Sequence, residues 1–192
     1  MAEPESNPAS KTKEIESLIA QFTSDSDAAR EKARLSLVSM GEQAVVPLIG
    51  ALRDRRLRIR WEAAKALGQI GNPLAAPALV EALEDPEFDV RWLSAEGLVS
   101  IGRAGLEAML TALTKRPESL WLRESAHHLL AHVVGEDTEV NHHLADHPVS
   151  KETRLRDVLK PVMAAIHGSH PVMEIPMAAA AALNELKRAG QK

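Results

Sequence analysis

A short pattern recurs along this chain. Residues 59–71 read IRWEAAKALGQIG, and residues 90–102 read VRWLSAEGLVSIG in the same frame. Residues 29–41 read AREKARLSLVSMG and carry an earlier copy, with the same places for the first Arg and the final Gly. The period is about 31 residues, and such regular spacing indicates a protein built from repeated structural units.

Two weaker copies follow. Residues 121–129 (WLRESAHHL) continue the period after Val90, with the Arg displaced by one place, and residues 175–183 (IPMAAAAAL) keep only the apolar frame. These two copies lie much further apart than one period, so extra residues enter between them. We align residues 160–166 with the second helix of a repeat, which places an insertion at roughly Gly135–Lys151 on the edge of the array. Such a loop is either a partner-specific contact or a tolerated insertion.

Each copy has the periodicity of a helix. Its inward side chains fall at the first, fifth, ninth and twelfth places, which share one face at 3.6 residues per turn. The final Gly suits a helix end with positive φ. A second apolar segment then follows, at residues 45–52, 75–83 and 106–113, and Pro47 and Pro77 stand in its first turn. The repeated unit is therefore predicted to be a helical hairpin.

Stacked hairpins predict an all-α fold. Small residues such as Ala63, Ala64 and Ala95 allow neighbouring helices to approach closely, so that each hairpin buries the apolar face of the last. We expect a right-handed α-solenoid, an armadillo-like superhelix of about five hairpins that forms a single domain over residues 11–192. A helix near Lys11–Phe22 would cap one end and Met177–Arg188 would close the other. The acidic, Pro-rich residues 1–10 are expected to be a disordered tail.

Composition excludes several classes of protein. The 192 residues are 45% hydrophobic but only 3% aromatic, and they contain no Cys, which excludes disulfides, thiolate nucleophiles and Cys-based metal centres. The net charge of −4 argues against general attraction to phosphate backbones or anionic membranes. No apolar stretch approaches the roughly 20 residues that cross a bilayer, and the first residues do not form a secretory signal. A cytoplasmic protein without membrane contact is expected, as a monomer or weak homo-oligomer.

The pattern resembles the HEAT-like repeats named after the phycobilisome lyase family. That consensus also opens with Val-Arg, passes through Ala-Ala and Ala-Leu-Gly, and closes with Ile-Gly. The resemblance is strong over residues 26–115 and weaker to residue 188. It implies the α-solenoid architecture, but such repeats occur in lyases, hydroxylases and scaffolds alike, so it does not imply one activity.

A candidate partner-binding stripe follows from the helix geometry. The third, fourth, seventh and eleventh places share a face, and the resemblance implies that this face is the concave side, where ligands are held. Equivalent Trp residues in successive repeats would offer a large rigid apolar area, as in an interface hot spot. Alternatively, both indoles fill the seam between stacked helices. The stripe residues are Trp61, Glu62, Lys65, Gln69, Trp92, Leu93, Glu96, Ser100, Arg123, Glu124 and His127.

No catalytic residues are predicted. Deoxyhypusine hydroxylase, which uses similar repeats, holds two irons with His-Glu pairs at the third and fourth places. Here no His-Glu pair occupies those places, and no Gly-rich phosphate loop or Gly-x-Ser-x-Gly elbow occurs. We therefore expect neither enzymatic activity nor a cofactor. The residues at the two places are Glu31-Lys32, Trp61-Glu62, Trp92-Leu93, Arg123-Glu124 and Met177-Ala178.

The histidines form a weak metal candidate. They cluster around the expected insertion, and His128 and His132 have the i, i+4 spacing with which two imidazoles can share a zinc ion. His142, His143 and His147 follow, and Asp137 or Asp146 could add an oxygen ligand. However, our alignment places His128 and His132 at the inward positions of Ala66 and Ile70. We therefore favour a structural role, in which they hydrogen-bond to the inserted loop.

A basic run is the last candidate. Arg53, Arg55, Arg56, Arg58 and Arg60 could form a nucleic-acid ridge, but the net charge is negative and no second basic cluster aligns with them. We instead expect the recurring Arg60 and Arg91 to bond loop carbonyls or Asp54, Asp85 and Asp89 at the hairpin junctions. Nucleic-acid binding is not predicted.

The sequence thus predicts a scaffold or adaptor that binds a protein partner on the concave face of a HEAT-like solenoid. The alternative is a phycobilin-lyase-like or metal-handling assembly subunit.

Overall fold

The computed structural model describes residues 8–134 and 155–189, and every element in these ranges is a helix. The elements are α1 (Pro8–Ala20), the 3-10 turn η1 (Gln21–Thr23), α2 (Asp27–Met40), α3 (Glu42–Ala51), α4 (Leu57–Ile70), the 3-10 turn η2 (Pro73–Ala75), α5 (Ala76–Ala82), α6 (Phe88–Ile101), α7 (Arg103–Lys115), α8 (Leu120–Val134), α10 (Leu155–Ile166) and α11 (Pro171–Ala189). None of these helices is long and apolar enough to cross a membrane.

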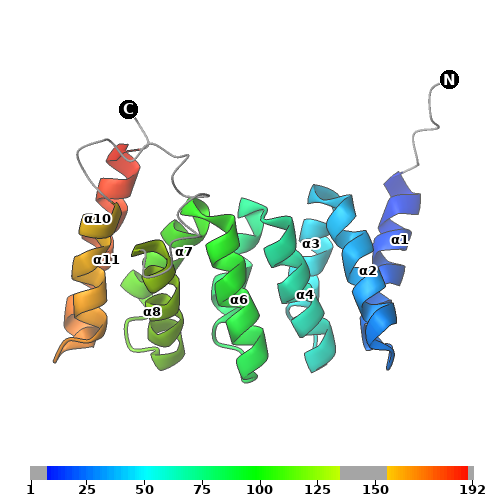
Figure 1. The fold of residues 1–192 in the computed structure, drawn as a ribbon, viewed down its shortest axis with the longest axis horizontal. Coiled ribbons are helices and arrows are strands. Elements are labelled where there is room, and N and C mark those ends of the chain that lie inside the picture. Colours follow the sequence, from blue (N-terminus) through cyan, green and yellow to red (C-terminus); the bar gives the residue numbers. More distant parts are fainter. Residues whose placement is uncertain (1–7, 135–154, 190–192) are drawn as a thin grey trace.

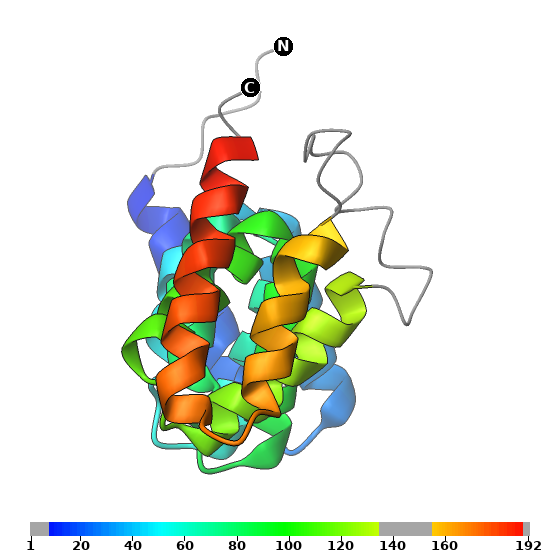
Figure 2. The ribbon, with the colours of Figure 1, turned by 90° about the vertical axis from the view of Figure 1, so that its left-hand side faces the viewer.

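The helices stack in two layers. Helices α2, α4, α6, α8 and α10, here called the first layer, stand side by side in Figure 1, each packed against the next. Helices α1, α3, α5, α7 and α11 form the second layer behind them, and the end-on view in Figure 2 shows both layers. The predicted α-solenoid of stacked helical pairs is confirmed.

Glycine ends the repeated helix as predicted. Gly41, Gly71 and Gly102 follow α2, α4 and α6, with φ of 58°, 66° and 72°, a region that side-chain-bearing residues rarely adopt. At Gly71 the amide donates a hydrogen bond to the Leu67 carbonyl, which satisfies one of the free carbonyls at the helix end. In each of these three repeats, the chain therefore leaves the first helix at an equivalent glycine and continues to the second helix.

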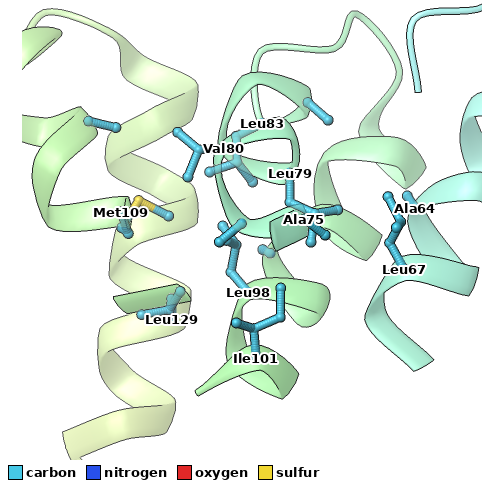
Figure 3. Packing of buried hydrophobic residues seen from close by; sticks show 14 of the residues in the cluster. Ala64, Leu67, Ala75, Leu79, Val80, Leu83, Leu98, Ile101, Met109 and Leu129 are labelled. Carbon is cyan, nitrogen blue, oxygen red and sulfur yellow. The ribbon is translucent and has the colours of Figure 1, made fainter. Parts of the chain in front are cut away.

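The core consists of small and medium aliphatic side chains. Leu67 of α4, Leu79 of α5, Leu98 of α6 and Met109 of α7 are fully buried and interdigitate between the layers (Figure 3). Phe22 in η1 is also fully buried and closes the core under the first repeat. Continuous packing between neighbouring helices is what holds an elongated array together.

The fourth repeat begins one residue later than our alignment assumed. The inward residues of α6 are Val90, Ser94, Leu98 and Ile101, and those of α8 are Leu122, Ala126, Leu130 and Val133. Leu122 is therefore equivalent to Val90, and the Arg that had seemed displaced, Arg123, is equivalent to Arg91. The assignment of Trp121 to the first inward place was wrong, since its side chain is 39% exposed.

The last hairpin also differs from the prediction. We had aligned α10 with the second helix of the fourth repeat and α11 with the first helix of a fifth. In the structure α10 packs against α8 in the first layer, whereas α11 packs against α7 and α10 in the second. Both assignments were therefore wrong. In the final helical pair, α10 is the first-layer helix and α11 is the second-layer helix.

At the N-terminal end α1 starts at Pro8, so residues 8–10 are helical where a disordered tail was predicted. The remainder of that tail lies outside the described residues, as does the predicted insertion at Gly135–Lys151.

Candidate partner-binding face

The tryptophans lie at equivalent places of α4 and α6, but their environments differ. Trp61 packs partly against the core, and the Lys65 ammonium lies 4.7 Å from its ring centroid. Trp92 is 45% exposed. Trp61 therefore partly fits the alternative prediction, in which the indole fills the seam between stacked helices. Trp92, in contrast, is exposed at the surface.

Trp92 belongs to a larger aromatic cluster, consisting of Phe88, Arg91, Trp92 and Trp121. The rings of Phe88 and Trp92 stack with centroids 6.2 Å apart, and Phe88 is 63% exposed. The Arg91 guanidinium lies 4.5 Å from the Trp121 ring centroid and 5.7 Å from that of Phe88. This aromatic cluster thus bridges the first turns of α6 and α8.

The sequence prediction did not include Phe88 or Trp121. Phe88 precedes the repeated pattern, and Trp121 was assigned inward because of the register error. The signal that could have found them is the alignment of Arg123 with Arg91, which places Trp121 before the first inward residue.

Glu62 does not share the exposure of the predicted stripe. It is only 3% exposed, and its Oε2 lies 2.6 Å from Nη1 of Arg34, which is itself buried. Arg30 Nε lies 3.5 Å from the other Glu62 oxygen. The prediction that Glu62 faces a partner was wrong, because α2 covers the carboxylate and uses it to pair with α4.

Two other stripe residues are exposed but bond between helices. Gln69 accepts a hydrogen bond from Arg34 Nε at 3.2 Å, which links α4 to α2. The Ser100 hydroxyl donates to the Gly68 carbonyl at 2.8 Å, which links α6 to α4. These side chains help to fix neighbouring helices relative to one another. Replacing them would therefore remove contacts between helices as well as change the exposed surface.

His128 and His132 take the seventh and eleventh places of the fourth repeat because that repeat begins at Leu122. They are equivalent to Glu96 and Ser100, not to Ala66 and Ile70, so the inward placement was wrong. His128 Nε2 lies 2.7 Å from Glu96 Oε1, and its ring contacts Trp92 at a centroid distance of 4.4 Å. Leu93, also of the predicted stripe, is partly buried against the core.

The stripe residues assigned to α8 lie elsewhere. Arg123, Glu124 and His127 line a groove of about 520 Å³ between α8 and the turn that joins α10 to α11. There the His127 ring meets the His167 ring edge-on at 4.8 Å. The register error accounts for Arg123 and His127, which occupy the second and sixth places of their repeat. Glu124 occupies the third place, equivalent to Trp92, so it keeps its predicted place but lines this groove. His142 and His143 lie outside the described residues.

The arginines behave as predicted at the hairpin junctions. Arg60 Nε donates to Asp85 Oδ2 at 2.6 Å and its Nη1 donates to the Asp54 carbonyl, while Arg91 donates to the Asp85 carbonyl. The bond to Asp85 raises the pKa of Arg60. The pKa of Asp54 is lowered because its carboxylate accepts hydrogen bonds from the Arg56 side chain and backbone. These bonds pair Arg56 and Arg60 of the basic run with groups in the loops.

The architecture is that of a helical-repeat solenoid. Comparison with known families indicates which class of helical repeat the chain resembles. Residues 15–99 match the family model for HEAT repeats. The resemblance to HEAT-like repeats is thus confirmed over this part of the chain. No curated protein matches it.

Similar solved structures are also repeat proteins. The complex of CpcE and CpcF of phycocyanin lyase from Nostoc sp. PCC7120 is 23% identical, with a TM-score of 0.44, over 98% of this chain and 68% of that one. A designed armadillo repeat protein in complex with the peptide (KR)4 is 19% identical, with a TM-score of 0.38, over 94% and 87%. An engineered protein is 18% identical, with a TM-score of 0.41, over 92% and 97%. At these values the likeness carries no conclusion about function.

Proposed function

We propose that this protein is a scaffold or adaptor that binds a protein partner on the first-layer face, centred on the aromatic cluster. The observation that carries the proposal is the exposure of Phe88 and Trp92 side by side, with Trp121 and Arg91 adjoining them. Exposed large rings grouped with an arginine have the composition of an interface hot spot. The proposed role is non-enzymatic and needs no cofactor. We further propose that the protein acts in the cytoplasm as a monomer or weak homo-oligomer.

The chemistry of the cluster indicates what it would bind. Its rings are held by Arg91, whose guanidinium is fixed by bonds to the backbone carbonyls of Asp85 and Pro86. A surface fixed in advance loses little conformational freedom on binding. The partner should therefore present apolar side chains that cover the rings.

A capture experiment tests this proposal. The double variant Phe88→Ala, Trp92→Ala should lose its partner from a lysate of the source cells, because hot-spot truncations each cost about 2 kcal/mol or more. The matched control is Val46→Ala, Leu74→Ala, which removes exposed apolar side chains from α3 and from the η2 turn. Quantified pull-downs should show capture by the wild type and the control alone. Equal capture by all three proteins, with unchanged helical circular dichroism, would refute the site.

A further inference from the structure

We infer that Glu96, His128 and His132 form a binding site for a divalent transition-metal ion such as Zn²⁺. One potential ligand atom from each residue lies within 4.8 Å of the other two. The residues come from adjacent first-layer helices, with the carboxylate on α6 and both imidazoles on α8. The site is separate from the aromatic cluster, although Trp92 contacts one of its histidines.

The repeat register produces this convergence. Glu96 and His128 occupy the same place of successive repeats, so they stand beside each other across the α6–α8 contact. His132 lies one helical turn beyond His128, on the same face, and the two rings are 4.6 Å apart. A side chain on one helix and an i, i+4 pair on the next thus point into one space.

The distances suit a small cation. Zinc bonds of about 2.0–2.2 Å in tetrahedral geometry require ligand atoms about 3.3 Å apart. The separations here start at 2.7 Å, between Glu96 Oε1 and His128 Nε2, and extend no further than 4.8 Å. The Glu96 side chain is 43% exposed, so it can rotate to admit an ion between itself and His128.

The state of His132 independently indicates a ligand. Its Nδ1 is buried and, among the described residues, has no hydrogen-bond partner. Whichever tautomer is present, a buried nitrogen of this kind costs about 1–3 kcal/mol while it is unsatisfied. A metal ion bound at this Nδ1 would compensate for that cost.

The ligand chemistry selects the class of ion. Two neutral imidazoles and one carboxylate favour borderline transition-metal ions over Mg²⁺ or Ca²⁺, which prefer oxygen ligands. Three protein ligands leave one tetrahedral position for water or for a group from another molecule. Because the Glu96 and His128 side chains are 43% and 25% exposed, that position can be reached from solvent.

Zinc titration of the chelator-treated full-length protein tests the inference. The wild type should bind one Zn²⁺ by isothermal titration calorimetry, and Co²⁺ in its place should give the visible absorption of a nitrogen and oxygen site. Glu96→Gln, His128→Ala and His132→Ala should each weaken binding by tenfold or more, since loss of even an outer-shell partner costs about 10–100-fold. His170→Ala, an exposed histidine in the α10–α11 turn, is the matched control and should bind as the wild type does.

Two further outcomes decide the question. The His142→Ala, His143→Ala variant should retain zinc, and loss of binding in this variant alone would overturn the assignment. Failure of the wild type to bind Zn²⁺ would also overturn it and leave the Glu96–His128 bond as a contact between helices. Glu96→Gln keeps the test valid if His132→Ala does not fold. Because zinc affinity and partner capture are measured separately, either proposal can fail alone.

Discussion

At the residue scale, the Arg34–Glu62 pair shows how this array uses charge inside its core. Both side chains are buried, and the pair joins α2 to α4 with support from Arg30 and Gln69. A buried pair need not stabilise a fold more than apolar residues would. Removing one partner, however, leaves the other charge buried and uncompensated.

We predict that Glu62→Ala lowers the free energy of unfolding by about 3–5 kcal/mol. Arg58→Ala, which breaks the exposed pair with Asp25, should cost no more than about 1 kcal/mol. Urea denaturation followed by circular dichroism measures both. Similar small losses for the two variants would show that the buried pair has no special role.

At the element scale, α4 and α6 of successive repeats approach each other closely at Gly68 and Gly97. A Cβ added at Gly68 would lie 3.1 Å from the Cα of Gly97, a backbone atom that cannot move away alone. The missing side chains allow these two helices, from successive repeats, to pack tightly. Gly50 in α3 has no atoms near its would-be Cβ.

Gly68→Ala and Gly50→Ala should therefore have different effects on stability. At Gly50 alanine should stabilise by about 0.5–1 kcal/mol, because it restricts the unfolded chain and favours helix. At Gly68 the same helix preference is opposed by overpacking, which costs about 1–3 kcal/mol. Thermal denaturation should show a lower Tm for Gly68→Ala than for Gly50→Ala. Equal Tm values would contradict the tight crossing.

At the scale of the whole molecule, each helix contacts near neighbours and the two ends of the array do not meet (Figure 1). Stability in such a structure is approximately a sum of repeat and interface contributions. Damage at one end should therefore remain local.

Ile175→Ala on α11 and Leu37→Ala on α2 test this at opposite ends. Both side chains are fully buried, and each truncation should cost about 2–5 kcal/mol in its own region. Hydrogen exchange should accelerate mainly in α10, α11 and α7 for Ile175→Ala, and mainly in α1, α2 and α4 for Leu37→Ala. Uniform acceleration along the chain in both variants would indicate a single cooperative unit instead.

The sequence alone predicted the helical hairpins, the solenoid and the glycine ends. These follow from signals within one repeat: apolar spacing, Pro77 in the first turn of α5, and glycines where φ must be positive. The prediction that Pro47 stands in a first turn was wrong, since α3 begins at Glu42 and Pro47 lies inside it. It also predicted the roles of Arg60 and Arg91, because their partners lie in neighbouring loops.

The tertiary structure decided what depends on contacts between repeats. A one-residue change of register turns a side chain by about 100° around its helix. Because our alignment placed the degenerate copy one residue too early, it did not reveal that His128 and His132 join Glu96, or that Trp121 joins the aromatic cluster. The burial of Glu62 and the layers of α10 and α11 depend likewise on which neighbouring helix packs against them, and a pattern read within one helix does not contain that information.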